Sequence, residues 1–348
     1  MNNFIFKTGT GFFFGSGCVK EYLASFLAGY GPNVLLVTDR AEPCAEAQDE
    51  VQHLLRRAGK QVVTCTVGPL CPRYEQVQQA ARLCRANRVD LILGVGGSAV
   101  LDGCKAAALG AVCRGDLWEN FGALQGVVDI PPLPVGFVSA HLETGAINGA
   151  AGMIHEGQCV WRDYPACDPQ FALLDPACLR AFSVRQLSGE GFSAFAGALE
   201  TYLLQSTGMG VPCRLLETLM AGMVRALDAL RQGKRDKELL SDLMWSCALW
   251  GSRFFQLGRK AAFPPLPMRE AALLTAEEDW EAYVRALAAR LPALLRQTGE
   301  NRPELPARLA RYVWELPARA QTAAGCVAAL EQLAGKLGLA PKQTASTA

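Results

Sequence analysis

A glycine-rich turn is the part of this sequence that points most directly to chemistry. Residues 91–105 read LILGVGGSAVLDGCK, an apolar run that breaks into glycines and resumes with helical spacing. Glycines between a strand and a helix let the backbone approach a phosphate, and the helix start offers N–H groups and a positive dipole end. The segment therefore predicts a dinucleotide or another phosphorylated ligand, with an ordinary tight turn as the alternative.

Two side chains outside the glycine turn are expected near the same place. Asp39 follows the apolar run 33–38, and His141 follows the run 133–139. Ligands of parallel sheets bind beyond the carboxyl ends of the strands. We therefore expect Asp39, Gly96 and His141 at one edge of a sheet.

The first half of the chain alternates short apolar runs with amphipathic segments, which predicts a parallel sheet covered by helices on both faces. The predicted strands are 33–38, 61–67, 90–95, 133–139 and 171–174, with 4–6 and 11–14 as a short hairpin or a paired edge. The predicted helices are 45–58, 75–87 and 100–112.

From residue 184 onward the sequence has almost no strand signal. Helical periods run through 185–207, 212–232, 236–257, 279–297, 305–316 and 318–337, and the prolines at 264–267 predict a loop or turn. This change predicts an α/β domain over residues 1–180 and an all-helical domain over residues 181–348.

Composition bounds the class of protein and its compartment. The 348 residues carry a net charge of +1, which gives no reason to expect a nucleic acid or a membrane as partner. No run is long and apolar enough to span a bilayer, and the first residues lack the pattern of a signal peptide. The 13 cysteines include no Cys-x-x-Cys spacing. Free thiols in the cytoplasm fit this pattern better than a disulfide scaffold or a zinc knuckle.

The order of these motifs resembles the iron-containing alcohol dehydrogenase family, which includes glycerol dehydrogenase and dehydroquinate synthase relatives. The matching segments are Phe4-x-Phe6, Phe14-Gly15-x-Gly17, 35–39, 94–105, Leu174-Asp175-Pro176, 191–202 and 248–251. The resemblance implies a Rossmann-like N-terminal domain, an all-helical C-terminal domain and a nicotinamide cofactor. It also implies a divalent metal, held by one Asp and three His.

The cofactor-binding part of the family pattern is only partly retained. The family's GGGS reads Gly96-Gly97-Ser98-Ala99, its TGSE reads Thr144-Gly145-Ala146-Ile147, and its preceding threonine pair reads Ala140-His141. The resemblance makes Asp39 the acid that meets the adenosine ribose, and a carboxylate there favours NAD over NADP. A plain turn or helix-capping acid is the alternative for Asp39. The residues predicted to bind the cofactor are Asp39, Gly96, Gly97, Ser98, Asp102, Lys105 and Thr144.

All four metal-ligand positions of the family are changed in this sequence. The first two fall on Ser193 and Gly197, and neither is a usual ligand of iron or zinc. The third should lie within 250–267, which contains no His, Asp, Glu or Cys, and the fourth falls on Met268. The only histidines are His53, His141 and His155, all in the first half. We therefore predict no metal.

Other groups must then supply the positive charge that a metal would provide during hydride transfer. Arg253, Arg259, Lys260 and Arg269 fall where the resemblance places the metal pocket, and His141 could act as a proton relay. Surface ion pairs for the basic residues and a structural role for His141 are the alternatives. The predicted catalytic residues are His141, Arg259 and Lys260.

Three functions stay open at this stage. The first is a metal-independent, NAD(P)-dependent interconversion of a small alcohol with an aldehyde or ketone. The second is an inactive, nucleotide-binding scaffold or regulator. The third is a different reaction, such as transfer or elimination on a phosphorylated metabolite. The resemblance also allows for a homodimer.

Overall fold

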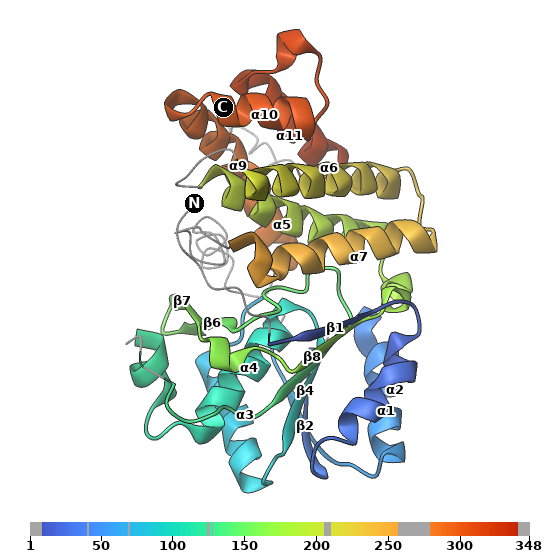
Figure 1. Ribbon diagram of the computed structural model, residues 1–348, viewed down its shortest axis with the longest axis vertical. Coiled ribbons are helices and arrows are strands. Elements are labelled where there is room, and N and C mark those ends of the chain that lie inside the picture. Colours follow the sequence, from blue (N-terminus) through green and yellow to red (C-terminus); the bar gives the residue numbers. More distant parts are fainter. Residues whose placement is uncertain are drawn as a thin grey trace, which may run out of the picture. The chain divides into compact units, whose positions relative to one another are not determined.

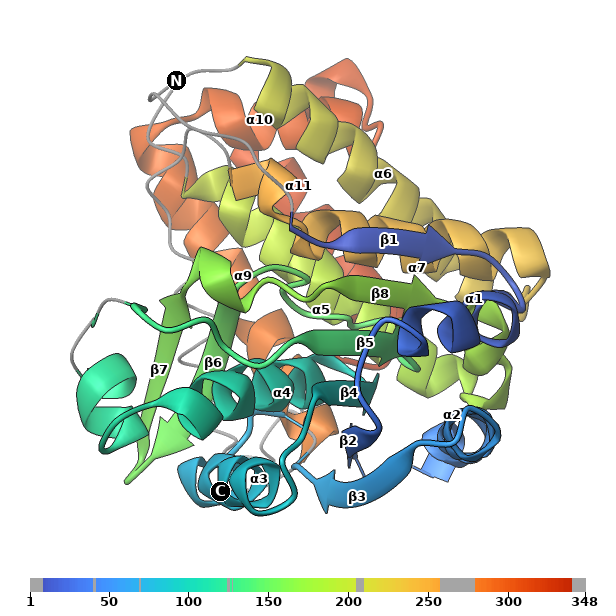
Figure 2. The same ribbon diagram turned by 60° about the horizontal axis from the view of Figure 1, so that its bottom comes forward.

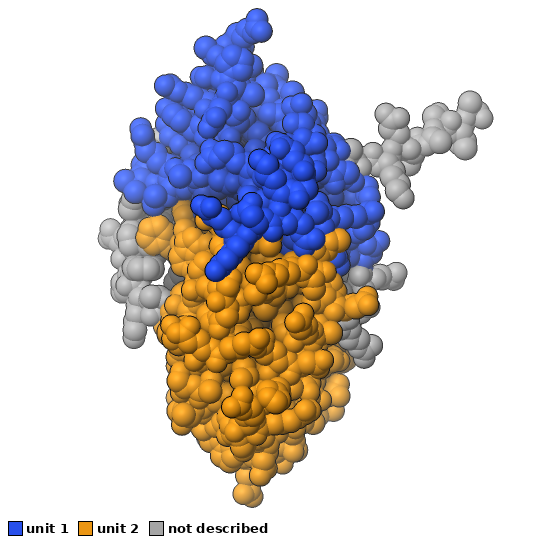
Figure 3. Space-filling view, turned by 90° about the vertical axis from the view of Figure 1, so that its right-hand side faces the viewer, with its two compact units in different colours: residues 1–2, 184–239, 258–348 blue, residues 3–183, 240–257 orange. Residues whose placement is uncertain are grey.

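The computed structural model describes residues 9–39, 42–68, 70–123, 126, 128–204, 210–256 and 279–339. By their internal contacts, residues 3–183 and 240–257 form one unit, and residues 184–239 and 258–348, with residues 1–2, form another (Figure 3). We call them the α/β unit and the helical unit. The division at residue 180 that the sequence predicts stays a prediction.

A six-stranded sheet forms the centre of the α/β unit. In the order in which they lie side by side, its strands are β1 (Gly11–Phe14), β8 (Phe171–Leu174), β5 (Val135–Ser139), β4 (Leu91–Gly96), β2 (Asn33–Thr38) and β3 (Gln61–Thr66) (Figure 2). Every neighbouring pair is parallel, as predicted. Every residue of β4, β5 and β8 is buried, because helices leave neither face of these apolar strands to water.

Four helices cover the two faces of this sheet. Helices α1 (Cys18–Leu27) and α2 (Ala45–Arg57) lie on one face, and α3 (Tyr74–Ala86) and α4 (Ser98–Val112) lie on the other (Figure 1). Helix α2 buries one stripe at four-residue spacing, Ala47, Val51 and Leu55, and exposes its charged face. Helix α4 is apolar almost all round, because α3 and a β-hairpin cover the sides that the sheet leaves.

That hairpin, like α1, is absent from the sequence predictions. Strands β6 (Ala150–His155) and β7 (Gln158–Asp163) pair antiparallel, and the turn between them places Glu156 and Gly157 at positive φ. The N-terminal expectation is resolved in favour of a paired edge, since β1 pairs parallel with β8. Residues 4–6 lie outside the described residues.

The helical unit is built from α5 (Val184–Leu203), α6 (Val211–Arg231), α9 (Trp280–Asn301), α10 (Glu304–Tyr312) and α11 (Ala323–Lys336). Most of helix α7 (Lys237–Gly251) is grouped with the α/β unit, where Asn148 Nδ2 donates to the carbonyl of Gly251 at 3.2 Å. No strand occurs among the described residues after Val184. In the described part of the chain, no helix combines the length and the apolar character needed to cross a membrane.

One buried ion pair ties the helical unit together. Arg308 donates to both carboxylate oxygens of Glu217, from Nε at 2.7 Å and from Nη2 at 2.6 Å, and the Tyr202 hydroxyl also donates to Glu217 at 2.7 Å. Glu217 is only 4% exposed, so these bonds replace the water that its charge has lost. Desolvation, and the adjacent Glu217 carboxylate, raise the pKa of Tyr202 far above its usual range.

Candidate functional site

The carboxyl ends of three neighbouring strands bring the predicted ligand-binding residues together. Asp39 directly follows β2, Gly96 ends β4, and Ala140 and His141 follow β5. The backbone N–H of Ala140 donates to the carbonyl of Gly96 at 3.0 Å, which holds the last two segments side by side. The predicted meeting of Asp39, Gly96 and His141 at one sheet edge is therefore observed.

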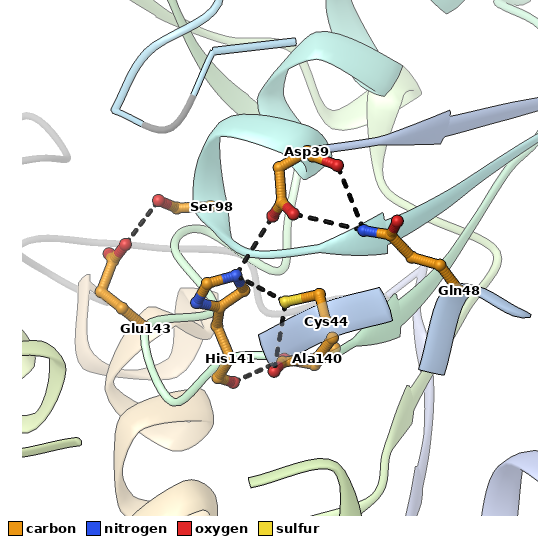
Figure 4. A network of polar contacts seen from close by, with 8 residues as sticks. Asp39, Cys44, Gln48, Ser98, Ala140, His141 and Glu143 are labelled. Atoms are coloured by element: carbon orange, nitrogen blue, oxygen red, sulfur yellow. Dashed lines mark hydrogen bonds and ion pairs between the residues drawn. The ribbon is translucent and has the colours of Figure 1, made fainter. Parts of the chain in front are cut away.

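Asp39 and His141 are in direct contact, and a third group joins them (Figure 4). The Nε2 atom of His141 lies 3.1 Å from Asp39 Oδ2 and 3.0 Å from the sulfur of Cys44. Cys44 ends a single 3₁₀ turn, Glu42–Cys44, and stands at the N-terminus of α2. The Asp39 and Cys44 residues are 7% and 0% exposed, and the His141 side chain is 16% exposed. Solvent or a ligand would therefore reach the cluster from the side of the His141 imidazole, which is its most exposed group.

Neighbouring groups fix the orientation of this cluster. Gln48 of α2 donates from Nε2 to both the carbonyl oxygen and Oδ1 of Asp39, at 3.2 and 3.3 Å. The Phe182 ring meets the imidazole edge-on, with 4.9 Å between the ring centroids. The positions of both acid and imidazole are thus set by contacts outside the pair.

The two glycines at the end of β4 make room for these side chains. A Cβ at Gly96 would lie 2.6 Å from Asp39 Oδ2 and 2.5 Å from a methyl group of Val100. A Cβ at Gly97 would lie 3.2 Å from the imidazole ring of His141. Position 96 therefore requires a glycine, because the Asp39 carboxylate lies where a larger residue would place its Cβ.

The start of helix α4 already has a hydrogen-bonding partner. The backbone N–H of Ser98 donates to the carbonyl of Glu143 at 3.1 Å, and the Ser98 hydroxyl donates to the Glu143 carboxylate at 2.5 Å. Gly145 takes a φ of +63° here, and a Cβ on it would lie 2.6 Å from the Ser98 Cβ. A carboxylate thus stands where a helix N-terminus could receive a phosphate, and a phosphate would have to displace it.

Asp102 and Lys105 point to a different part of the fold. Lys105 Nζ donates to the carbonyl oxygens of Ala146, at 2.9 Å, and Ala150, and lies 2.9 Å from Asp102 Oδ1. Asp102 Oδ2 accepts the backbone N–H of Gly152 at 3.0 Å. Burial raises the pKa of Asp102 and Lys105 counteracts this shift. Both residues are almost fully buried and hold the main chain of residues 146–152, so a cofactor contact for them stays a prediction.

The other predicted site residues differ in how far the structure describes them. Thr144 is 1% exposed, and its hydroxyl has no hydrogen-bond partner among the described residues. Such a buried hydroxyl is a candidate contact for a bound molecule. Arg259, Lys260, Arg269 and the predicted proline turn at 264–267 lie outside the described residues, and so does Met268.

Helix α5 carries Ser193 and Gly197, which the sequence predicts at two of the family's four metal-ligand positions. Ser193 and Gly197 are both buried and lie about one helical turn apart, but neither side chain is a carboxylate or an imidazole. The Ser193 hydroxyl has no hydrogen-bond partner in the described part of the chain. Neither of these two residues offers a usual ligand for an iron or zinc ion.

Sequence reasoning missed three residues of the sheet-edge site: Cys44, Gln48 and Glu143. Cys44 looked like one of many scattered cysteines, because its partner His141 is 97 residues away. The grouping of Asp39, Cys44 and His141 places three metal-ligating atoms within 4.8 Å of one another. The sequence analysis predicts no metal anywhere in the chain, so this cluster, which could hold one, is a finding of the structure.

Comparison with known proteins gives a consistent picture. Residues 9–176 match the family model of iron-containing alcohol dehydrogenases. The chain is 24% identical over 327 residues to the probable NADH-dependent butanol dehydrogenase 1 of Bacillus subtilis, covering 92% of this chain and 83% of that protein. It is also 24% identical over 327 residues to the NADPH-dependent aldehyde reductase YqhD of Escherichia coli, covering 91% and 81% of the two chains.

The solved structures confirm the predicted fold class. The NADH-dependent butanol dehydrogenase A of Thermotoga maritima superposes with a TM-score of 0.82 at 22% identity, covering 97% of this chain and 84% of that one. Residues 9–176 are thus similar to the iron-containing alcohol dehydrogenase family, and the chain shares the fold of the solved dehydrogenase structure.

Proposed function

We propose that this chain binds a nicotinamide dinucleotide at the carboxyl ends of β2, β4 and β5 and uses it to interconvert a small alcohol with an aldehyde or ketone. The observation that carries the proposal is the family match over residues 9–176, which contains the glycine turn and Asp39. Relatives named as NADH-dependent butanol dehydrogenases and an NADPH-dependent aldehyde reductase support the reaction class.

The residues at the sheet edge support nucleotide binding on one condition. Asp39 provides the acceptor for a ribose hydroxyl, and its negative charge favours NADH over NADPH. The Ser98 hydroxyl must release the Glu143 carboxylate, and the Ser98 N–H must release the Glu143 carbonyl oxygen, before either can face a pyrophosphate. We therefore infer that Glu143 opposes dinucleotide binding through its charge and its hydrogen bond.

The reaction itself is proposed to proceed without the family's metal. When bound, a reduced nicotinamide supplies the hydride. Because Ser193 and Gly197 offer no usual ligand, the developing alkoxide would be stabilised by a cation of this chain, for which Lys260 and Arg259 are the candidates. The predicted proton relay through His141 is not supported by this contact, because His141 touches Asp39, the proposed acceptor for the adenosine ribose, which lies at the other end of a dinucleotide from the nicotinamide.

Turnover of chelator-treated protein tests this proposal. NADH oxidation is followed with a panel of aldehydes and ketones, before and after EDTA, for the natural sequence and for Lys260→Ala and His141→Ala. We expect activity that EDTA does not abolish and that Lys260→Ala lowers by about 100-fold or more, the usual scale for loss of one group that stabilises the developing charge. A fall of similar size for His141→Ala is the result that the predicted proton relay requires. Loss of activity on chelation, with recovery on adding iron, would contradict metal independence.

A second candidate function is an inactive protein that binds the nucleotide as a scaffold or regulator. The changed donor set on α5 favours it, because a helix retained without its ligands fits a lost reaction. Saturable NADH binding without turnover across the whole panel is the result that would select this function over the first.

A further inference from the structure

The side chains of Asp39, Cys44 and His141 converge on one point instead of forming a chain. In a nucleophile–histidine–acid relay, the nucleophile and the acid contact different nitrogens of the imidazole. Here the Cys44 sulfur and Asp39 Oδ2 both contact Nε2, at 3.0 and 3.1 Å. A single nitrogen holds one proton at a time and cannot pass it from one partner to the other. The geometry therefore fits a ligand set better than a catalytic relay.

The two ligand-atom separations from His141 Nε2 are close to those of a tetrahedral zinc site. Bonds of about 2.0–2.3 Å from zinc to nitrogen, oxygen and sulfur place the ligand atoms about 3.3–3.6 Å apart. The observed separations from Nε2 are a few tenths of an ångström shorter, and all three atoms lie within 4.8 Å of one another. Small outward movements of the side chains would admit the ion.

Charge and chemistry also match a zinc ion. A carboxylate and a thiolate together neutralise a divalent cation, so a site with these two groups buried would carry no net charge. The mixed sulfur, nitrogen and oxygen donors suit zinc better than magnesium or calcium, which prefer oxygen alone. Cys44 stands at the N-terminus of α2, where the helix dipole favours a negative charge.

Residues around the cluster orient its ligands, as the residues that contact metal ligands do in known metal sites. Gln48 donates to Asp39 Oδ1 at 3.3 Å, and Phe182 meets the His141 ring. The bare backbone at Gly97 lets the imidazole lie within 3.2 Å of the place that a Cβ would take. Partners that orient the ligands in this way contribute to metal affinity.

We propose that Asp39, Cys44 and His141 form a zinc site with three protein ligands at the nucleotide-binding edge of the sheet. A fourth position is left for water. Since Asp39 is also the proposed ribose acceptor, zinc and the dinucleotide exclude each other. This competition, unlike the zinc site itself, rests on the proposed function.

Cobalt binding to the full-length, metal-stripped protein tests the site directly. We expect one Co²⁺ per chain, displaced by Zn²⁺, with a sulfur-to-cobalt charge-transfer band. Cys44→Ser should abolish the band and weaken binding by more than about 100-fold, and Gln48→Ala should weaken it by about tenfold. Cys84→Ser is the matched control, because Cys84 is an equally buried thiol on α3.

Either of two results would overturn the site: no charge-transfer band in the natural sequence, or a band that Cys84→Ser removes and Cys44→Ser leaves. The competition has its own measurement. With free Zn²⁺ at ten times its dissociation constant, the apparent Kd for NADH should rise about tenfold, and an unchanged Kd would refute exclusion. If the protein binds no NADH at all, the proposed function fails while the cobalt result still decides the site.

Discussion

Two clusters of buried polar groups, one in each unit, are built in opposite ways. In the helical unit, Glu217 and Arg308 satisfy each other through two short hydrogen bonds, and Tyr202 completes the set. At the edge of the α/β sheet, the Asp39 carboxylate and the Cys44 thiol both contact the same nitrogen atom of the His141 imidazole. A closed pair of this kind stabilises a fold, whereas converging donors on a partly exposed edge are suited to receive a ligand.

The largest expected effect comes from opening the closed pair. Arg308→Ala leaves the Glu217 carboxylate buried without its cation, which should lower the free energy of unfolding by about 3–5 kcal/mol in chemical denaturation. The control Arg225→Ala breaks an exposed pair with Glu315 and should cost no more than about 1 kcal/mol. NADH affinity under native conditions should be unchanged in both, and a loss confined to Arg308→Ala would make this pair part of the site.

A pair of glycine substitutions compares the two units at intermediate size. Gly96→Ala places a methyl group against Asp39 and Val100, so we expect a loss of about 1–3 kcal/mol in unfolding free energy and weaker binding of NADH and zinc. Gly222→Ala, in the middle of α6 with nothing within 4 Å of the new Cβ, should stabilise by up to about 1 kcal/mol. Equal effects of both would show that Gly96 is not a constrained position.

The pH dependence of one hydrogen bond gives a smaller effect. Tyr74 donates to Asp116, which lowers the pKa of that carboxyl, while burial of the phenol, together with Asp116, raises the pKa of Tyr74 to about 12. The stabilisation is full above the ordinary carboxyl pKa and is lost as pH falls through the lowered one. Tyr74→Phe should therefore cost about 1 kcal/mol at pH 7 and progressively less below about pH 4. A cost that does not change with pH would contradict this coupling.

The smallest effect is expected on α5. Ser193→Ala removes a buried hydroxyl that has no partner in the described part of the chain, so stability should change by less than about 1 kcal/mol. Metal content and NADH affinity should not change. If Ser193→Ala lowered either of them, a ligand role would persist on this helix.

The sequence allowed the sheet and most helices to be predicted because their apolar spacing is regular. The run 33–38 is observed as strand β2, and the stripe of Ala47, Val51 and Leu55 makes the prediction of α2 accurate. The β6–β7 hairpin was missed because apolar and polar residues alternate only weakly along its strands. Their pairing is set by the turn, in which two residues adopt positive φ angles.

The candidate site could be predicted only in part. Asp39, Gly96 and His141 follow from the rule that ligands bind at the carboxyl ends of parallel strands. The contributions of Cys44 and Glu143 depend on side-chain contacts between segments far apart in the chain, and no local pattern signals them. Lys105 was predicted to bind the cofactor, but it is buried and donates to a backbone carbonyl. The sequence alone does not distinguish such a structural lysine from a ligand-binding one.

Calorimetric titration of NADH into the metal-stripped protein is the most direct test of the account, with Asp39→Ala and Glu143→Ala measured alongside. We expect one saturable site without added metal, at least about tenfold weaker binding for Asp39→Ala, and tighter binding for Glu143→Ala as a like charge leaves the start of α4. No binding by the natural sequence, or binding that appears only after iron is added, would contradict it.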